Sequence, residues 1–228
     1  MRVLHSADSK GKNQADYRRA PSKRSAHNPP EIHSGNEKMI IAISGQSGCG
    51  NTTVTDLLEQ AHGLRKINFT LRNLASEKNV SFHELCARAA IDPSIDLELD
   101  HKIIELLNET KENQVVGSRL AIWFGDPRIA TKLGITSVEL PRIDLKVWLY
   151  ASFEVRAART HAIKPKEPPE YTQKRDAEDR QRYLRAYGID VLEHSQANLV
   201  IDTEKFNAKD VVALIAEAAK REIGRAHV

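Results

Sequence analysis

The residues with the clearest chemical potential form a glycine-rich stretch, Gly45-Gln-Ser-Gly-Cys-Gly-Asn-Thr-Thr53, directly after an apolar run over residues 39–43. The apolar run is too short for a helix and rich in β-branched residues, which is typical of a buried parallel strand. Residues 54–62, which follow, have helical character. Glycines let successive backbone amides point inward, and a helix N-terminus adds partial positive charge. The stretch therefore predicts a cradle for the phosphates of a polyphosphate ligand.

Asn51 departs from the phosphate-loop pattern G-x-x-x-x-G-K-[ST], which has lysine at this position. An asparagine amide can donate hydrogen bonds to a phosphate oxygen, but it brings no positive charge. Thr52 keeps the hydroxyl that ligates Mg²⁺ in such loops. The alternative is a glycine-rich turn without a ligand, which the agreement of strand, glycines and Thr52 disfavours. Cys49 has two interpretations: the electropositive loop lowers the pKa of its thiol, or, as we favour, it fills space beneath the loop.

Three clusters of basic residues are placed to neutralise a transferred phosphoryl group. Arg72 follows the second predicted strand, at the mouth expected of an acceptor pocket. Arg119 follows the third, after a glycine that allows close approach. Arg156 and Arg159 precede residues 164–169, a proline-rich loop of the kind expected of a lid.

A further charged set, Arg175, Asp179 and Arg182, is spaced at i, i+4 and i+7. On a helix this spacing places all three side chains on one face. The alternative is a solvated helix with surface ion pairs, each contributing about 0.5 kcal/mol or less. The glycine loop and the lid-like loop in the same chain favour a ligand-binding face.

The elements that must position these residues alternate along the chain. Short apolar segments separated by helical ones predict five strands, at residues 39–43, 65–68, 114–118, 145–150 and 198–202. This alternation is typical of an α/β fold with a doubly wound parallel sheet, in which ligands bind at the carboxyl ends of the strands. Residues 124–142 contain two glycines and two prolines, and we expect an irregular insertion there.

Composition excludes several classes of protein. The 228 residues, 40% of them hydrophobic, suffice for one domain with a buried core. Residues 1–38 carry eight basic and four acidic side chains, so the remaining 190 residues carry 26 basic and 27 acidic ones and do not form a general nucleic-acid binder. The two cysteines lack metal-site spacing, and there is no signal-peptide core and no apolar run of the ~18 residues that span a bilayer. We expect a cytoplasmic protein.

Both ends of the chain differ from this body. Residues 1–38 are polar and basic and cannot bury enough apolar surface to become ordered, so we expect a disordered extension. The first strand starts directly at Met39, which favours a natural start there; a tether for nucleic acid or membrane is the alternative. Residues 222–228, EIGRAHV, match the translation of a common sequencing adapter, so we expect a non-native tail. The functional domain is predicted to span residues 39–221.

The order and spacing of several motifs resemble those of the cytidylate kinase group of nucleoside monophosphate kinases, in its compact archaeal-type form, over roughly residues 39–218. Besides the glycine-rich stretch, the motifs are Asp92-Pro-Ser-Ile-Asp-Leu-Glu-Leu-Asp100, Gly117-Ser-Arg-Leu-Ala121, Asp144-Leu-Lys-Val-Trp-Leu149, Glu154-Val-Arg-Ala157, Tyr183-Leu-Arg-Ala-Tyr-Gly-Ile-Asp190 and Leu199-Val-Ile-Asp-Thr203. The resemblance implies a P-loop NTPase fold of three α/β/α layers, with a five-stranded parallel sheet, a helical acceptor-binding segment and a short lid.

The resemblance also implies roles for individual residues. Arg119, Arg156 and Arg159 would be catalytic, and Thr52 would ligate the Mg²⁺ that accompanies ATP. The residues implied to bind ATP are Gly45, Gln46, Ser47, Gly48, Cys49, Gly50, Asn51, Thr52 and Thr53. The residues implied to bind the acceptor nucleotide are Arg72, Asp100, Arg119, Arg175, Asp179 and Arg182, with Asp100 at the base.

The activity implied is ATP-dependent phosphorylation of CMP or dCMP to the diphosphate by a monomer, with no nucleic-acid or membrane partner. Asn51 replaces the loop lysine, although compact members of the group can carry threonine there, and Gly117-Ser118 replaces the usual acid and glycine. Two alternatives stay open. One is a kinase of the same fold that uses UMP, AMP or a small metabolite as acceptor. The other is a nucleotide-binding protein with weakened catalysis.

Overall fold

The computed structural model of the chain describes residues 38–225, so the predicted extension up to residue 37 and the last three residues of the predicted tail lie outside the described part. Its centre is a sheet of five parallel strands in the order β2-β3-β1-β4-β5. The strands are β1 Ile40–Gly45, β2 Arg65–Ile67, β3 Gln114–Gly117, β4 Leu145–Tyr150 and β5 Leu199–Asp202. All five strands expected from the sequence are therefore confirmed.

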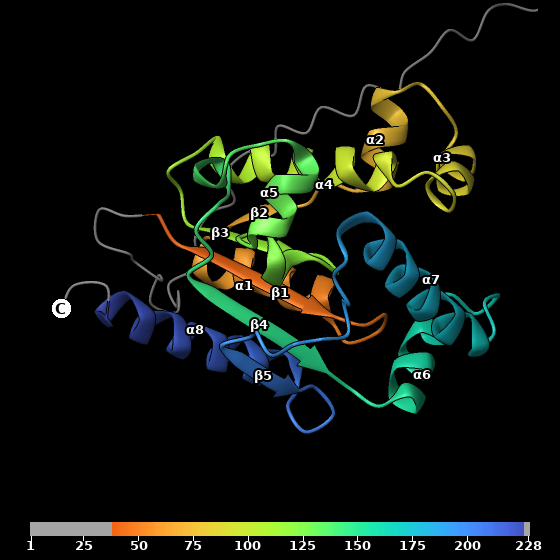
Figure 1. The fold of residues 1–228 in the computed structure, drawn as a ribbon. Helices are drawn as coiled ribbons and strands as arrows, with labels where there is room; N and C mark the ends of the chain where they lie inside the picture. Colours follow the sequence, from red (N-terminus) through yellow and green to blue (C-terminus); the bar gives the residue numbers. More distant parts are fainter. Residues whose placement is uncertain (1–37, 226–228) are drawn as a thin grey trace, which may run out of the picture.

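Helices fill the connections between the strands (Figure 1). They are α1 Asn51–His62, α2 Leu71–Glu77, α3 Phe82–Ala89, α4 Ser94–Asn108, α5 Pro127–Leu133, α6 Phe153–Ile163, α7 Glu170–Tyr187 and α8 Ala208–Arg225. Two short 3-10 turns, η1 Ala121–Trp123 and η2 Ser137–Glu139, flank α5. Helix α8 continues through residues 222–225, the first part of the tail that we expected to be non-native. Within the described residues, none of the helices combines the length and the apolar character that crossing a membrane requires.

The expectation of an irregular segment over residues 124–142 is wrong. The Asp126 side chain accepts a hydrogen bond from the backbone amide of Arg128 and so caps α5, and Pro127 takes the first helical position. Gly134 ends the helix in the left-handed conformation, at φ +68°. The glycines and prolines that suggested irregular structure include the residues that begin and end this helix.

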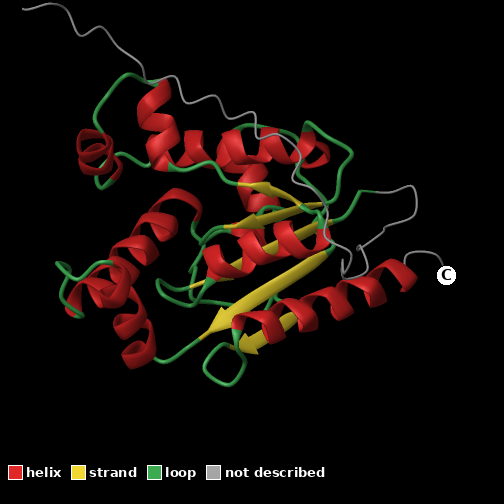
Figure 2. Ribbon diagram, turned by 180° about the vertical axis from the view of Figure 1, so that it is seen from behind, coloured by secondary structure: helices red, strands yellow, loops and turns green. Residues whose placement is uncertain are grey.

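Alternate residues of the central strand separate two cores on opposite faces of the sheet. Ile40 and Ala42 of β1 pack in the core formed with α2 to α5 and α7. Ile41 and Ile43 pack in the core formed with α1 and α8. Figures 1 and 2 show α1 and α8 along one face and α4 and α5 along the other. The predicted three-layer α/β/α fold is confirmed.

The carboxyl ends of the strands lie between two groups of helices. Helices α6 and α7 lie side by side beyond the end of β4 (Figure 1), and α2, α3 and α4 lie toward β2. Helix α7 contacts both α6 and α4, so it connects the two groups. The glycine-rich loop after β1 opens into the space that these helices surround.

Candidate active site

The loop after β1 has the curled backbone that a phosphate cradle requires. Gly48 and Gly50 adopt φ angles of +83° and +103°, a region that glycine enters readily and other residues rarely. A Cβ on Gly48 would lie 2.5 Å from the carbonyl oxygen of Arg156, and one on Gly45 would lie 2.6 Å from that of Leu149. Close approach of other backbone segments therefore requires glycine at both positions.

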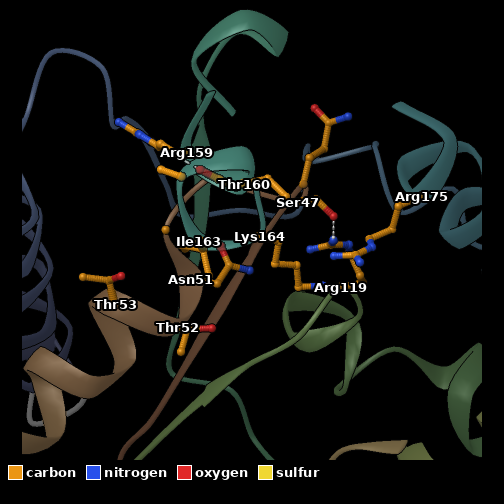
Figure 3. A pocket seen from close by; sticks show the side chains of 14 residues that line it. Ser47, Asn51, Thr52, Thr53, Arg119, Arg159, Thr160, Ile163, Lys164 and Arg175 are labelled. Carbon is orange, nitrogen blue, oxygen red and sulfur yellow. Dashed lines mark hydrogen bonds between the residues drawn. The ribbon is translucent and has the colours of Figure 1, made fainter. Parts of the chain in front are cut away.

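A cavity of about 570 Å³ opens beside this loop (Figure 3). One side of the cavity is formed by Gln46, Ser47, Gly48, Gly50, Asn51, Thr52 and Thr53. The other side is formed by Arg119, Arg159, Thr160, Ala162, Ile163, Lys164 and Arg175. Backbone amides of a glycine loop on one side and four cationic side chains on the other suit a polyanionic ligand.

Asn51 and Thr52 begin α1 at the base of the cavity. The Oδ1 atom of Asn51 is buried and has no hydrogen-bond partner, and it lies 3.0 Å from the position of a Cβ on Gly45. Protein contacts alone therefore leave this polar position unsatisfied. The residues from 38 to 225 include no group of three His, Cys, Asp or Glu side chains able to hold a metal. At nucleotide sites Mg²⁺ binds few protein atoms and takes most of its ligands from phosphate and water oxygens. The hydroxyl of Thr52, which lines the cavity, fits a protein ligand of such an ion.

Asp176 of α7, which sequence analysis did not single out, holds the loop in place. Its carboxylate accepts hydrogen bonds from the Ser47 amide at 3.1 Å and from Gln46 Nε2 at 3.2 Å. It also pairs with the Arg156 guanidinium at 2.5 Å, and Arg156 donates to the Ser47 carbonyl at 3.0 Å. Asp176 and Arg156 are only 8% and 5% exposed. This buried pair positions the loop, so Arg156 faces the loop backbone rather than the cavity.

Arg119 joins the loop to helix α7. Its guanidinium donates to the Gly45 carbonyl at 2.8 Å and to the Ser47 hydroxyl, and it pairs with Asp179 at 2.9 Å. Arg182 extends this row of ion pairs, because its guanidinium lies 3.6 Å from the other carboxylate oxygen of Asp179. The structure therefore brings together Arg119, Asp179 and Arg182, which the sequence separates by up to 63 positions.

Arg159 lies between the main cavity and a smaller one of about 220 Å³. It donates to the Thr203 hydroxyl at 2.9 Å, to the Thr203 carbonyl at 2.7 Å and to the Gly48 carbonyl at 3.4 Å. The smaller cavity is lined by Cys49, Gly50, Thr53, Val54, Arg159, Thr203, Phe206, Asn207, Ala208 and Val211. Sequence analysis missed Phe206 and the contact with Thr203, although Thr203 belongs to a quoted motif.

Asp100 lies in a buried cluster between α4 and α7. The Tyr187 hydroxyl donates to Oδ2 of Asp100 at 2.9 Å, and Oδ1 is buried without a partner. Burial of the carboxyl group, with the nearby charge of Asp96, raises the pKa of Asp100 to about 8. Asp96 itself pairs with Arg182. The helical segment thus holds a buried carboxyl group with a raised pKa beside the Asp96–Arg182 ion pair.

The other two predicted acceptor residues are less enclosed. The Arg72 guanidinium lies 3.9 Å above the centre of the Phe82 ring. Burial raises the pKa of the Cys86 thiol, and the charges of both Arg182 and Arg72 oppose this rise. Arg175 of α7 lines the main cavity together with residues of the glycine-rich loop.

Of the two interpretations of Cys49, the packing role is confirmed. Its side chain is 1% exposed and belongs to the core shared with α1 and α8. Burial raises the pKa of its thiol above the usual value, in spite of the nearby Arg156 and Arg119 charges. Loss of hydration therefore outweighs the positive field that would activate a thiol.

A parallel sheet whose first strand runs into a phosphate loop, with cationic residues of α6 and α7 across the cavity, is typical of a kinase of the P-loop fold. No protein-family model matches the chain. Cytidylate kinase 2 of Borrelia garinii subsp. bavariensis is 39% identical over 189 residues, which cover 78% of this chain and 95% of that protein. The cytidylate kinases of Pyrococcus horikoshii and Methanosarcina barkeri are each 32% identical, over 80% and 82% of this chain and 88% and 99% of theirs. The chain belongs to the cytidylate kinase family.

Solved structures agree with the fold. An uncharacterised protein from Eubacterium ventriosum superposes with a TM-score of 0.55 at 16% identity, over 80% of this chain and 98% of that one. Shikimate kinase from Acinetobacter baumannii, solved in complex with shikimate, superposes with a TM-score of 0.50 at 18% identity, over 80% of this chain and 93% of that one. At these identities the similarity concerns the fold alone.

Proposed function

We propose that the protein transfers the γ-phosphoryl group of ATP to CMP or dCMP. Membership of the cytidylate kinase family supports this activity. The observation that carries it is the set of contacts made by Arg119, which bridges the Gly45 carbonyl of the phosphate loop and Asp179 of α7. A cation that touches both the donor loop and the proposed acceptor-binding helix suits the point at which a phosphoryl group passes between two nucleotides.

The transfer would need little covalent chemistry from the protein. An oxygen of the acceptor phosphate forms a bond to the γ-phosphorus of ATP as the bond from that phosphorus to the β,γ-bridging oxygen breaks, and ADP leaves. The acceptor phosphate is already anionic, so no general base is required, and positioning carries most of the rate enhancement. Arg119 would neutralise charge on the moving group, and Arg159 lines the same cavity. Thr52 would hold Mg²⁺, which when bound offsets the charge on the donor phosphates.

The two ends of the donor would occupy the two neighbouring cavities. The backbone amides of the loop, in the main cavity, would bind the triphosphate. The smaller cavity, where Phe206 and Val54 offer apolar surface, would accept the nucleoside end, with Arg159 at the junction. On the acceptor side, the unpartnered Oδ1 of Asp100 would contact the base. Arg72, Arg175 and Arg182 would surround the acceptor sugar and phosphate.

A second candidate, a nucleotide-binding protein with weakened catalysis, is favoured by one observation, the asparagine at position 51. An ADP-release assay with Mg-ATP and each of CMP, dCMP, UMP and AMP separates the candidates. We expect turnover with CMP and dCMP far above that with UMP and AMP. No turnover with any acceptor, by a folded protein that binds ATP, would favour the second candidate. We also propose a monomer located in the cytoplasm.

The Arg119→Ala variant tests the assignment of the central cation. We expect the rate of transfer to fall by about 100-fold or more, because a charge aimed at the transferred group is removed. ATP binding is expected to stay within about threefold of the unchanged protein, since the loop amides remain and Asp176 still holds the loop. If the variant keeps its rate, the assignment of Arg119 is wrong.

A further inference from the structure

The phosphate loop has no lysine, so the side chain at position 51 brings no positive charge to the donor phosphates. We propose that Lys164, from the loop between α6 and α7, supplies the charge that Asn51 does not, by binding the β- and γ-phosphates of ATP. The proposal rests on the proposed function, since it assumes that the main cavity holds the triphosphate. Four cationic residues line that cavity: Arg119, Arg159, Lys164 and Arg175.

Two of these cations are already committed to fixed polar partners. Arg119 contacts the Gly45 carbonyl, the Ser47 hydroxyl and the Asp179 carboxylate. Arg159 makes two hydrogen bonds with Thr203 and one with the Gly48 carbonyl. These contacts orient both guanidinium groups and limit how far they move toward the base of the cavity, where the loop lysine would normally reach.

The other two cations share a single counter-ion. Glu167 accepts from Lys164 Nζ at 3.0 Å through one carboxylate oxygen and lies 3.5 Å from the Arg175 guanidinium through the other. One carboxylate neutralises only one of the two cations, so this rim of the cavity keeps a positive charge. The Lys164 and Glu167 side chains are 45% and 29% exposed. Ion pairs at this exposure contribute about 1 kcal/mol or less, so exchange of Glu167 for a triphosphate costs little.

Position and chemistry favour Lys164 over Arg175. Lys164 directly follows α6, whose last residues line the cavity, and its backbone is placed by the helix while its side chain extends from it. Figure 3 shows Lys164 and Asn51 in the same cavity, Lys164 from the loop after α6 and Asn51 from the start of α1. A lysine has the flexible stem and compact ammonium group of the residue that the loop lacks. Asn51 would keep the hydrogen-bonding part of that role and Lys164 would take the charge.

The first test compares Lys164→Met with Lys166→Met, a change of an exposed lysine in the same loop that does not line the cavity. The measurements are kcat and KM with ATP and CMP, and the affinity for a non-hydrolysable ATP analogue without acceptor. We expect Lys164→Met to lower kcat and weaken analogue binding by about tenfold or more, since a charge-assisted hydrogen bond is lost. Lys166→Met is expected to stay within about threefold. Equal effects of Lys164→Met and Lys166→Met would overturn the proposal.

The second test is a double-mutant cycle with Asn51→Lys. If Lys164 supplies the missing charge, a lysine on the loop restores most of the analogue affinity lost in Lys164→Met and adds little to the unchanged protein. An equal gain in both backgrounds, or none in either, means that the two positions share no role and overturns the proposal. Analogue binding does not depend on the acceptor. Failure of the unchanged protein to phosphorylate CMP while it binds the analogue therefore counts against the proposed function alone.

Discussion

Replacement of Asp100 by asparagine is expected to make the protein more tolerant of rising pH. Burial raises the pKa of this carboxyl group from 3.8 to about 8. Between these two values the unfolded chain releases the Asp100 proton while the folded chain keeps it. The folded state then binds more protons, so the free energy of unfolding falls as pH rises. Asparagine cannot ionise, and its side-chain oxygen can still accept the Tyr187 hydrogen bond.

The size of the effect follows from the separation of the two pKa values. Each pH unit in the window lowers the free energy of unfolding of the unchanged protein by about 1.4 kcal/mol through this group. From 3.8 to pH 7 the total is roughly 4 kcal/mol, a large share of the stability of an ordinary domain. Below pH 4 both states are protonated, and above pH 8 both are ionised, so the slope from this group vanishes outside the window.

Urea unfolding at pH 5, 6 and 7 measures this slope. The difference in free energy of unfolding between Asp100→Asn and the unchanged protein should grow in favour of the variant by about 1.4 kcal/mol per pH unit. A constant offset caused by the buried amide does not alter the slope. Glu98→Gln, an exposed change on the same helix, is the matched control and should run parallel to the unchanged protein.

Parallel pH profiles for Asp100→Asn and the unchanged protein would refute this account of Asp100. A second readout separates stability from function. If the carboxyl group contacts the acceptor base, kcat/KM for CMP falls in Asp100→Asn while KM for ATP stays unchanged. A more stable and less active variant would indicate that a costly buried carboxyl group is kept for substrate recognition.

Three further tests concern the glycines of the chain, the buried ion pair that holds the phosphate loop, and the two cysteines. Gly48→Ala should abolish ATP binding, measured by calorimetry, because its Cβ would lie 2.5 Å from the carbonyl oxygen of Arg156. Gly63 also has a positive φ but has open space around it, so Gly63→Ala should cost about 1 kcal/mol of stability in thermal unfolding and leave ATP binding intact. Asp176→Ala leaves the buried Arg156 without its carboxylate partner, so the free energy of unfolding measured in urea should fall by about 3–5 kcal/mol. A fall of less than about 1 kcal/mol would contradict a stabilising role of this buried ion pair. A thiol reagent should modify Cys86 in the folded protein and Cys49 only after unfolding, and rapid modification of Cys49 would contradict its burial.

The sheet and the phosphate loop could be predicted because their signals are local. A buried parallel strand is a short apolar run, and a phosphate loop is a fixed spacing of glycines between a strand and a helix. The segment at 124–142 was misread because Pro127 and Gly134 break a helix in its interior but begin and end one at its ends. The pattern alone does not say which position a proline or glycine occupies.

Asp176 and Asp96 could not be identified from sequence spacing because their partners are distant in the chain. Asp176 contacts Ser47, 129 residues away, and Asp96 contacts Arg182, 86 residues away. Both carboxylates lie in charged or amphipathic helices, where an acidic residue is ordinarily a solvated one. Only packing of α7 against the loop and α4 removes them from water. The i, i+4, i+7 stripe on α7 was a useful local signal, since Asp179 and Arg182 do form ion pairs off the helix.

Helix α7 connects the glycine-rich loop to α4 through three charged side chains. Asp176 contacts the glycine-rich loop, Asp179 contacts Arg119, and Arg182 contacts Asp96 of α4. Asp176 and Arg182 are six positions apart in the sequence, which is about 9 Å along a helix. Because each of the three side chains has a partner outside the helix, α7 links the position of α4 to that of the glycine-rich loop. In the proposed function, this one helix would set the relative position of donor and acceptor, which is the geometric control that phosphoryl transfer between two anions requires.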